Sequence, residues 1–191
     1  MKAHSGWAAL VVVGKRGSAF VVVDRRRIEL VERQSAMQPY HAAKRGKPAA
    51  AREAVKRAIQ AARRISTREV RAAVKRERER GNEVTGCTVL VGNPMANWSV
   101  EEILAVHFRM HKAEGMLFRD VLIRAAKACG LRLIAINEQQ LTEHAERALG
   151  TPRNRLLRVT AALGKSVGPP WGKDQKEAAL AAMIALRGRP K

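Results

Sequence analysis

Cysteine and aromatic residues are scarce in this sequence. The chain of 191 residues has two cysteines, Cys87 and Cys129, which form no metal-binding pattern, so we interpret both as small reduced side chains in the core. Aromatic residues make up 4% of the chain, which argues against a single-strand binder that stacks bases on exposed rings. Trp171, in a loop rich in glycine and proline, is the best candidate for stacking on an unpaired base.

Targeting segments and several common catalytic patterns are also missing. The N-terminus has no signal-peptide pattern, and no apolar run is long enough to span a bilayer, so we expect a cytoplasmic protein with no membrane partner. Gly164-Lys165-Ser166 imitates the end of a Walker phosphate loop but lacks the preceding glycine and strand. No Ser-His-Asp or Cys-His arrangement stands out.

Acidic residues are few compared with basic ones. The chain has 37 Lys or Arg against 17 Asp or Glu, a formal charge of +20, which favours a polyanionic partner, most often nucleic acid. Residues 1–80 hold 21 basic and 7 acidic residues, and therefore +14 of that charge. The alternatives are a solvated basic surface or a partner with acidic patches.

One stretch predicts a strand, a helix and a second, parallel strand. Residues 88–91 are a short β-branched run, and Ser99 and Glu102 have the spacing of a capping box at the start of a long helix. Gly130 ends that helix, and residues 131–136 form the next strand. A strand, crossover helix and strand normally give a parallel pair, so the fold class is α/β.

The remaining segments extend this unit on both sides. Apolar runs and turn signals predict an antiparallel meander of three strands at 7–13, 18–23 and 27–32, with a turn at 24–26. Helical periodicity and capping signals predict helices at about 49–64, 66–80, 139–149, 152–163 and 174–187. We therefore expect a mixed five-stranded sheet flanked by helices, in one domain over residues 1–191 with a basic helical segment at about 44–81. Three meandering strands followed by helix, strand, helix and strand is the ribonuclease H-like order.

Clusters of cations in turns, and in a loop expected at residues 38–48, are candidate phosphate contacts. Such contacts position a duplex without reading its sequence. The candidates are Lys15, Arg16, Arg25, Arg26, Arg27, Lys44, Arg45 and Lys47.

Three short segments resemble the RuvC branch of the ribonuclease H-like superfamily, the Holliday-junction resolvases. They are His107-Phe-Arg-Met-His-Lys-Ala-Glu-Gly115 with the strand at 131–136, Arg155-Leu-Leu-Arg-Val-Thr-Ala-Ala-Leu163, and Asp174-Gln-Lys-Glu177 at the start of the last helix. The resemblance implies a homodimer that binds branched DNA. It also implies two Mg²⁺ or Mn²⁺ ions, held by acids on the first strand, at the end of the fourth strand and at the start of the last helix.

The chain supplies only part of that acidic set. Asp174 and Glu177 match the family pattern and are the implied catalytic metal ligands, although Asp-x-x-Glu is also a capping box. Residues 7–13 contain no acid, and Asn93, which offers only a neutral carbonyl ligand, stands where the pattern expects Glu. We therefore expect weak or lost nuclease activity, because two divalent ions need several carboxylates around them.

His107, His111 and Glu114 form a second candidate metal site. Their spacing places them on one helix face, where two imidazoles and a carboxylate suit Zn²⁺ or Mn²⁺. The alternative is a hydrogen-bonded polar cluster in the core or at a dimer interface.

These observations leave three hypotheses. The first is a RuvC-like protein that binds branched or duplex nucleic acid and, if active, hydrolyses phosphodiesters with a metal-activated water. The second is a non-catalytic DNA- or RNA-binding scaffold on the same fold, with no cofactor. The third is an unrelated basic α/β protein bound, for example, to ribosomal RNA.

Overall fold

The computed structural model describes residues 1–187, so the last four residues of the predicted domain lie outside the described part of the chain. Its five strands are β1 (Lys2–His4), β2 (Trp7–Arg16), β3 (Ala19–Glu29), β4 (Cys87–Val91) and β5 (Leu133–Asn137). The sheet has the order β3-β2-β1-β4-β5, in which the first three strands pair antiparallel and β1, β4 and β5 pair parallel. The predicted α/β class and the mixed five-stranded, ribonuclease H-like sheet are confirmed.

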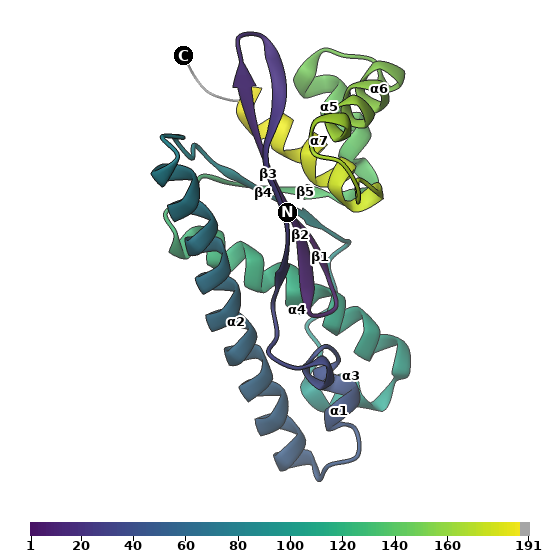
Figure 1. Ribbon diagram of the computed structural model, residues 1–191. Coiled ribbons are helices and arrows are strands. Elements are labelled where there is room, and N and C mark those ends of the chain that lie inside the picture. Colours follow the sequence, from purple (N-terminus) through teal and green to yellow (C-terminus); the bar gives the residue numbers. More distant parts are fainter. Residues whose placement is uncertain (188–191) are drawn as a thin grey trace.

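Helices cover both faces of the sheet (Figure 1). They are α1 (Pro39–Ala43), α2 (Pro48–Glu79), α3 (Val100–Ala105), α4 (His107–Ala128), α5 (Leu141–Leu149), α6 (Arg153–Leu163) and α7 (Lys173–Arg187), with 3-10 turns at Gln34–Ala36, Glu138–Gln140 and Gly164–Ser166. Helix α4 packs on one face and α2 packs along α4, whereas α7, flanked by α5 and α6, packs on the other face. No helix within residues 1–187 is both long and apolar enough to cross a membrane.

Alternation along the strands divides the core between these two layers. In β2, Leu10 packs with the α2–α4 layer, and its neighbour Val11 packs with the α5–α7 layer. Val89 and Leu90 of β4 divide in the same way. This is the period of two expected of a strand that is buried on both faces.

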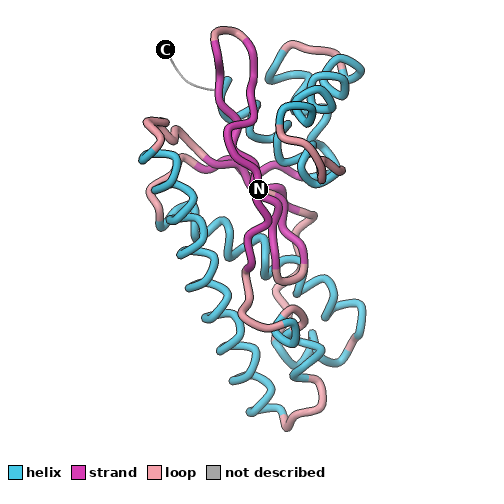
Figure 2. The backbone as a smooth tube through the Cα atoms, in the orientation of Figure 1, coloured by secondary structure: helices cyan, strands magenta, loops and turns pink. Residues whose placement is uncertain are grey.

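The predicted meander has the right number of strands but the wrong boundaries. Its first strand is Lys2–His4, and the predicted turn at 24–26 lies inside β3, which forms a long hairpin with β2 (Figure 2). The pairing shifts register between Val12 and Val13, which pair with Asp24 and Val22. This bulge breaks the polar–apolar alternation at the position where the sequence suggested a turn.

Three helix predictions also need correction. The two helices predicted between residues 49 and 80 are one helix, α2, because Ser66 is buried inside it and donates its hydroxyl to Arg63 O and Val121 O instead of capping a new helix. The long helix predicted after Ser99 is interrupted at Val106, whose backbone is extended, giving α3 and α4. The segment predicted as a loop before residue 48 contains α1.

Candidate functional site

Three carboxylates converge on one lysine at the carboxyl edge of the parallel strands. Lys2 extends from β1, Glu138 directly follows β5, and Asp174 and Glu177 lie in the first turns of α7. Lys2 Nζ lies 2.8 Å from Glu138 Oε1 and 3.3 Å from Asp174 Oδ1, and it forms a hydrogen bond with Glu177. The Lys2 side chain is only 7% exposed, so its ammonium lies inside this carboxylate cluster.

The charges of this cluster balance among the protein's own side chains. Burial lowers the pKa of Lys2, but the hydrogen bonds and negative charges of Glu138 and Glu177 outweigh burial, and the net pKa is raised above its ordinary value. Lys2 is therefore cationic at neutral pH. Arg119 lies 4.0 Å from Glu138, and Lys173 lies 3.7 Å from Glu177, so three cations face three carboxylates.

A short aromatic stack borders the cluster. His4 Nε2 lies 3.0 Å from Asp174 Oδ2, although this nitrogen is buried and lacks the geometry of a hydrogen bond to it. The His4 ring stacks on Trp7 with centroids 4.3 Å apart, and the Arg27 guanidinium lies 4.2 Å from the Trp7 ring. These contacts order β1 and its neighbours beside the carboxylates.

The donor set does not fit the pair of Mg²⁺ ions that a ribonuclease H-like nuclease uses. The carboxylate oxygens are directed at an ammonium, which repels a divalent cation and donates no electron pair to it. Asn93 Oδ1, the predicted carbonyl ligand, accepts a hydrogen bond of 2.9 Å from Asn137 Nδ2. Residues 7–13, where the resemblance places an acid, lie in β2 and contain none.

Sequence reasoning found Asp174 and Glu177 but missed Glu138 and Lys2. The side chains of Asp174 and Glu177 contact Lys2, and Asp174 also contacts His4. These two carboxylates therefore belong to the cluster and not only to the start of α7. Glu138 had a usable signal, since an acid directly after a parallel strand lies at the same sheet edge as residues following the neighbouring strand. Lys2 had none, because β1 has three residues and no recognisable alternation.

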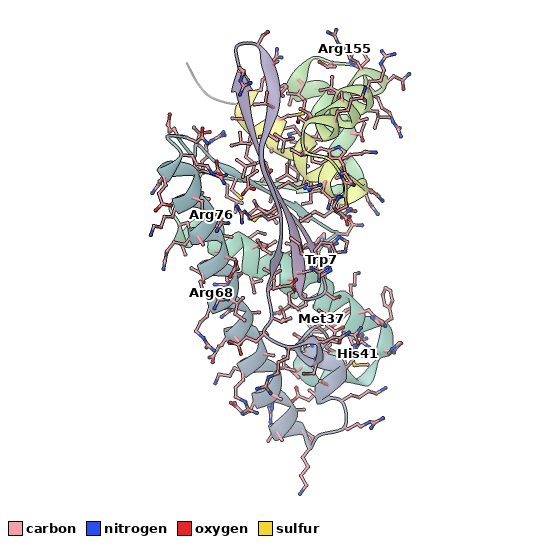
Figure 3. All side chains as sticks on the ribbon, viewed as in Figure 1. Trp7, Met37, His41, Arg68, Arg76 and Arg155 are labelled. Atoms are coloured by element: carbon pink, nitrogen blue, oxygen red, sulfur yellow. The ribbon has the colours of Figure 1, made fainter. Side chains whose placement is uncertain are left out.

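Helix α2, the longest helix of the described residues, is strongly basic. This helix contains ten Lys or Arg and four Glu and, at 1.5 Å per residue, is about 48 Å long. Arg64, Arg68, Arg71 and Lys75 are exposed and spaced by four, three and four positions, so they form one stripe, which we call the α2 stripe. Figure 3 shows Arg68 on the side of α2 that faces away from the sheet.

The structure disperses the predicted phosphate contacts. Lys15 and Arg16 are exposed at the end of the β2–β3 hairpin. Lys44, Arg45 and Lys47 are exposed in the connection between α1 and α2, at the other end of the molecule (Figure 1). The two groups do not form one patch.

The cations of β3 have partners within the protein. Arg25 donates to the carbonyls of Gly168, Pro169 and Pro170, and thereby holds the loop before α7. Arg26 pairs with Asp24 at 2.6 Å. Arg27 pairs with Glu29 and covers the Trp7 ring.

Trp171 has intramolecular contacts as well. Its Nε1 donates a hydrogen bond of 2.8 Å to Thr160 O, and its half-buried ring lies against Gly164, where a Cβ would collide with it. These contacts give Trp171 a structural role between α6 and α7. Stacking of this ring on a base remains a prediction.

The predicted His107, His111 and Glu114 group gains a fourth member, His41. Glu114 is buried and lies against His41, whereas His107 and His111 are exposed. Three imidazoles, and not two imidazoles and a carboxylate, therefore come together at the surface.

No protein-family model matches the sequence, and no curated protein matches it significantly. Among solved structures, the chain is similar to RuvC from Thermus thermophilus, with a TM-score of 0.48 and 11% identity over 97% of this chain and 90% of that chain. The strand order β3-β2-β1-β4-β5 and the helices on both faces of the sheet define the fold independently of this similarity.

Proposed function

We propose that this protein binds duplex or branched DNA on a ribonuclease H-like fold without cutting it. The observation that carries the proposal is the Lys2 ammonium among Glu138, Asp174 and Glu177. Phosphodiester hydrolysis on this fold needs divalent ions between the carboxylates and the substrate. Lys2 provides a fixed positive charge in that position, which pairs with the carboxylates but activates no water.

The α2 stripe is the proposed phosphate-binding surface. A straight helix presents charges at fixed intervals, and each contact with a phosphate releases counterions from the DNA. Arg68 is adjacent to Glu69, and Lys75 is near Glu79, yet the helix as a whole keeps an excess of six positive charges. Binding through such a surface fixes the position of a duplex and is insensitive to base sequence.

The convergence of three carboxylates favours a second candidate, a metal-dependent nuclease. In that case Lys2 would have to leave the carboxylates before ions could enter, at the cost of its buried ion pairs. The resemblance to resolvases supports a preference for four-way junctions and a homodimer under either candidate. Cleavage in the presence of metal separates the two.

The binding surface is tested with paired triple variants. One replaces Arg64, Arg68 and Arg71 on α2 by alanine, and the other replaces Arg153, Arg155 and Arg158, which are exposed on α6. Both remove three positive charges. The dissociation constant for a labelled four-way junction and a matched duplex is measured against salt concentration in EDTA.

The α2 variant should reduce the slope of log K against log salt by about 2 to 3, because each lost phosphate contact removes about 0.9. The α6 variant should reduce it by less than 1. Equal effects of the two variants on the slope would show that binding depends on net charge and not on α2. A larger effect of the α6 variant would show that the binding surface lies on α6. Failure of the wild-type protein to bind either DNA would contradict the proposed function.

A further inference from the structure

Three histidine rings from two separate helices meet at the contact between α1 and α4. His41 belongs to α1, while His107 and His111 occupy adjacent turns of α4. The ring centroid of His41 lies 5.1 Å from that of His107 and 4.5 Å from that of His111, and the latter two centroids are 4.6 Å apart. One nitrogen of each ring lies within 4.8 Å of the others.

A buried carboxylate fixes the orientation of His41. Glu114 is 2% exposed and accepts hydrogen bonds of 3.2 Å from the backbone amides of Tyr40 and His41. His41 Nδ1 lies 2.9 and 3.0 Å from its two oxygens. An ionised carboxylate only accepts hydrogen bonds, so Nδ1 carries the hydrogen.

The other nitrogen of His41 is then left with a lone pair. Nε2 is buried and has no hydrogen-bond partner among the described residues. A buried ring nitrogen without a partner is unfavourable, and a bound ligand is one physical reason for such an atom. The Glu114–His41 pair has the arrangement in which a carboxylate holds a metal-binding imidazole from behind.

We propose that His41, His107 and His111 bind one Zn²⁺ ion, with Glu114 as the residue that positions His41. Imidazole nitrogens suit Zn²⁺ and related transition metals, whereas Mg²⁺ and Ca²⁺ prefer oxygen ligands. Zn–N bonds of about 2.0–2.1 Å require the nitrogens to approach one another more closely, which rotations of the exposed His107 and His111 side chains allow. Three protein ligands leave a fourth position for water or another ligand.

The ion also explains the local charge and connectivity. The Glu114 carboxylate is buried, and a divalent ion on the far side of the His41 ring supplies a positive charge close to it. The same ion links α1, a helix of five residues between β3 and α2, to the long helix α4. This site shares no residue with the carboxylate cluster around Lys2, so it does not depend on the proposed DNA binding.

Metal binding is measured directly on protein without an affinity tag. Zinc content is determined by mass spectrometry, Zn²⁺ affinity by competition with a chromophoric chelator, and coordination by the visible spectrum after Co²⁺ substitution. The variants are His107→Ala, His111→Ala and Glu114→Gln, and the matched control is His144→Ala on α5. We expect one Zn²⁺ per chain and a tetrahedral Co²⁺ spectrum in the wild type and the control.

Loss of His107 or His111 should abolish the Co²⁺ spectrum, and Glu114→Gln should weaken Zn²⁺ binding by about 10- to 100-fold. Exposed His107 and His111 can be replaced without opening the core, so these two variants test the ligands even if Glu114→Gln fails to fold. The proposal is overturned if the wild type binds Zn²⁺ no more tightly than His107→Ala, or if His144→Ala loses the ion as well.

Discussion

Lys2 Nζ lies 2.8 Å from Glu138 Oε1, and this contact joins the central strand of the sheet to the residue that follows its edge strand. Asp174 and Glu177 contact the same ammonium from α7, on one face of the sheet. A single amino group thus contacts carboxylates from two separate elements.

Replacing Lys2 by Met should destabilise the protein by about 2–3 kcal/mol. The variant leaves three carboxylates facing one another without their central cation, and removal of one member of a buried ion pair costs about 3–5 kcal/mol. The effect is expected below that range because each carboxylate is about a quarter exposed, between 23% and 28%. Urea unfolding measures it, with Lys56→Met as the control, since the Lys56–Glu53 pair is exposed and should contribute less than about 0.5 kcal/mol. Equal losses in the two variants would show that the ammonium is not held by the cluster.

The stabilisation by Lys2 should persist through neutral and moderately alkaline pH. The pKa of Lys2 is raised in the folded protein, so its contribution is fully present below the unfolded pKa of about 10.4 and is lost as pH rises through the higher folded pKa. The difference in unfolding free energy between the wild type and Lys2→Met should stay constant from about pH 7 to pH 10 and shrink above that range. A difference that already shrinks near pH 8 would mean that burial, and not the carboxylates, controls this amine.

Replacing Lys2 by Asp should create affinity for Mg²⁺ that the wild type lacks. The variant directs four carboxylates at one position, which suits a divalent cation. A divalent ion that binds only the folded state raises the unfolding temperature of the protein. Thermal unfolding with and without Mg²⁺ should show stabilisation of Lys2→Asp and no change in the wild type or in the Lys56→Asp control. Stabilisation of the wild type by Mg²⁺ to the same extent would show that Lys2 yields to the ion.

Trp171→Phe should destabilise the protein by about 1 kcal/mol without changing DNA affinity. The ring remains against Gly164, but the hydrogen bond from Nε1 to Thr160 O is lost. Urea unfolding and junction binding are measured on the same preparation, together with Trp171→Ala. If Trp171→Ala, still folded, weakens junction binding while the salt slope stays unchanged, the ring stacks on a base, as the sequence suggested.

The sequence predicted the strand–helix–strand unit from β4 to β5 well because its boundaries follow from local signals. The capping box at Ser99 and Glu102 is present in the structure, and Gly130, with a positive φ of 68°, ends the segment after α4. The strand boundaries before residue 30 were wrong because a bulge beside Asp24 imitates a turn, and β1 is too short to produce a pattern. The extra helix start at Ser66 was wrong because a buried serine inside a helix has the same sequence signature as a cap.

The candidate sites could be predicted only in part because each depends on contacts between distant segments. Asp174 and Glu177 carry a local motif, whereas their partner Lys2 contacts them only through the folding of β1 beside α7. His107 and His111 share a helix face, but His41 joins them from a segment that looked like a loop. Spacing identifies residues on one element, and only tertiary packing brings the other elements to them.

The most direct measurement uses a labelled four-way junction and a matched duplex, incubated with the wild-type protein in Mg²⁺, Mn²⁺ or EDTA and scored for both binding and cleavage. We expect binding of similar strength in all three conditions and intact strands in each, because the Lys2 ammonium fills the position that catalytic ions need. Symmetric nicks that appear with Mg²⁺ or Mn²⁺ but not with EDTA, and that disappear in an Asp174→Asn variant, would contradict this expectation and identify an active nuclease.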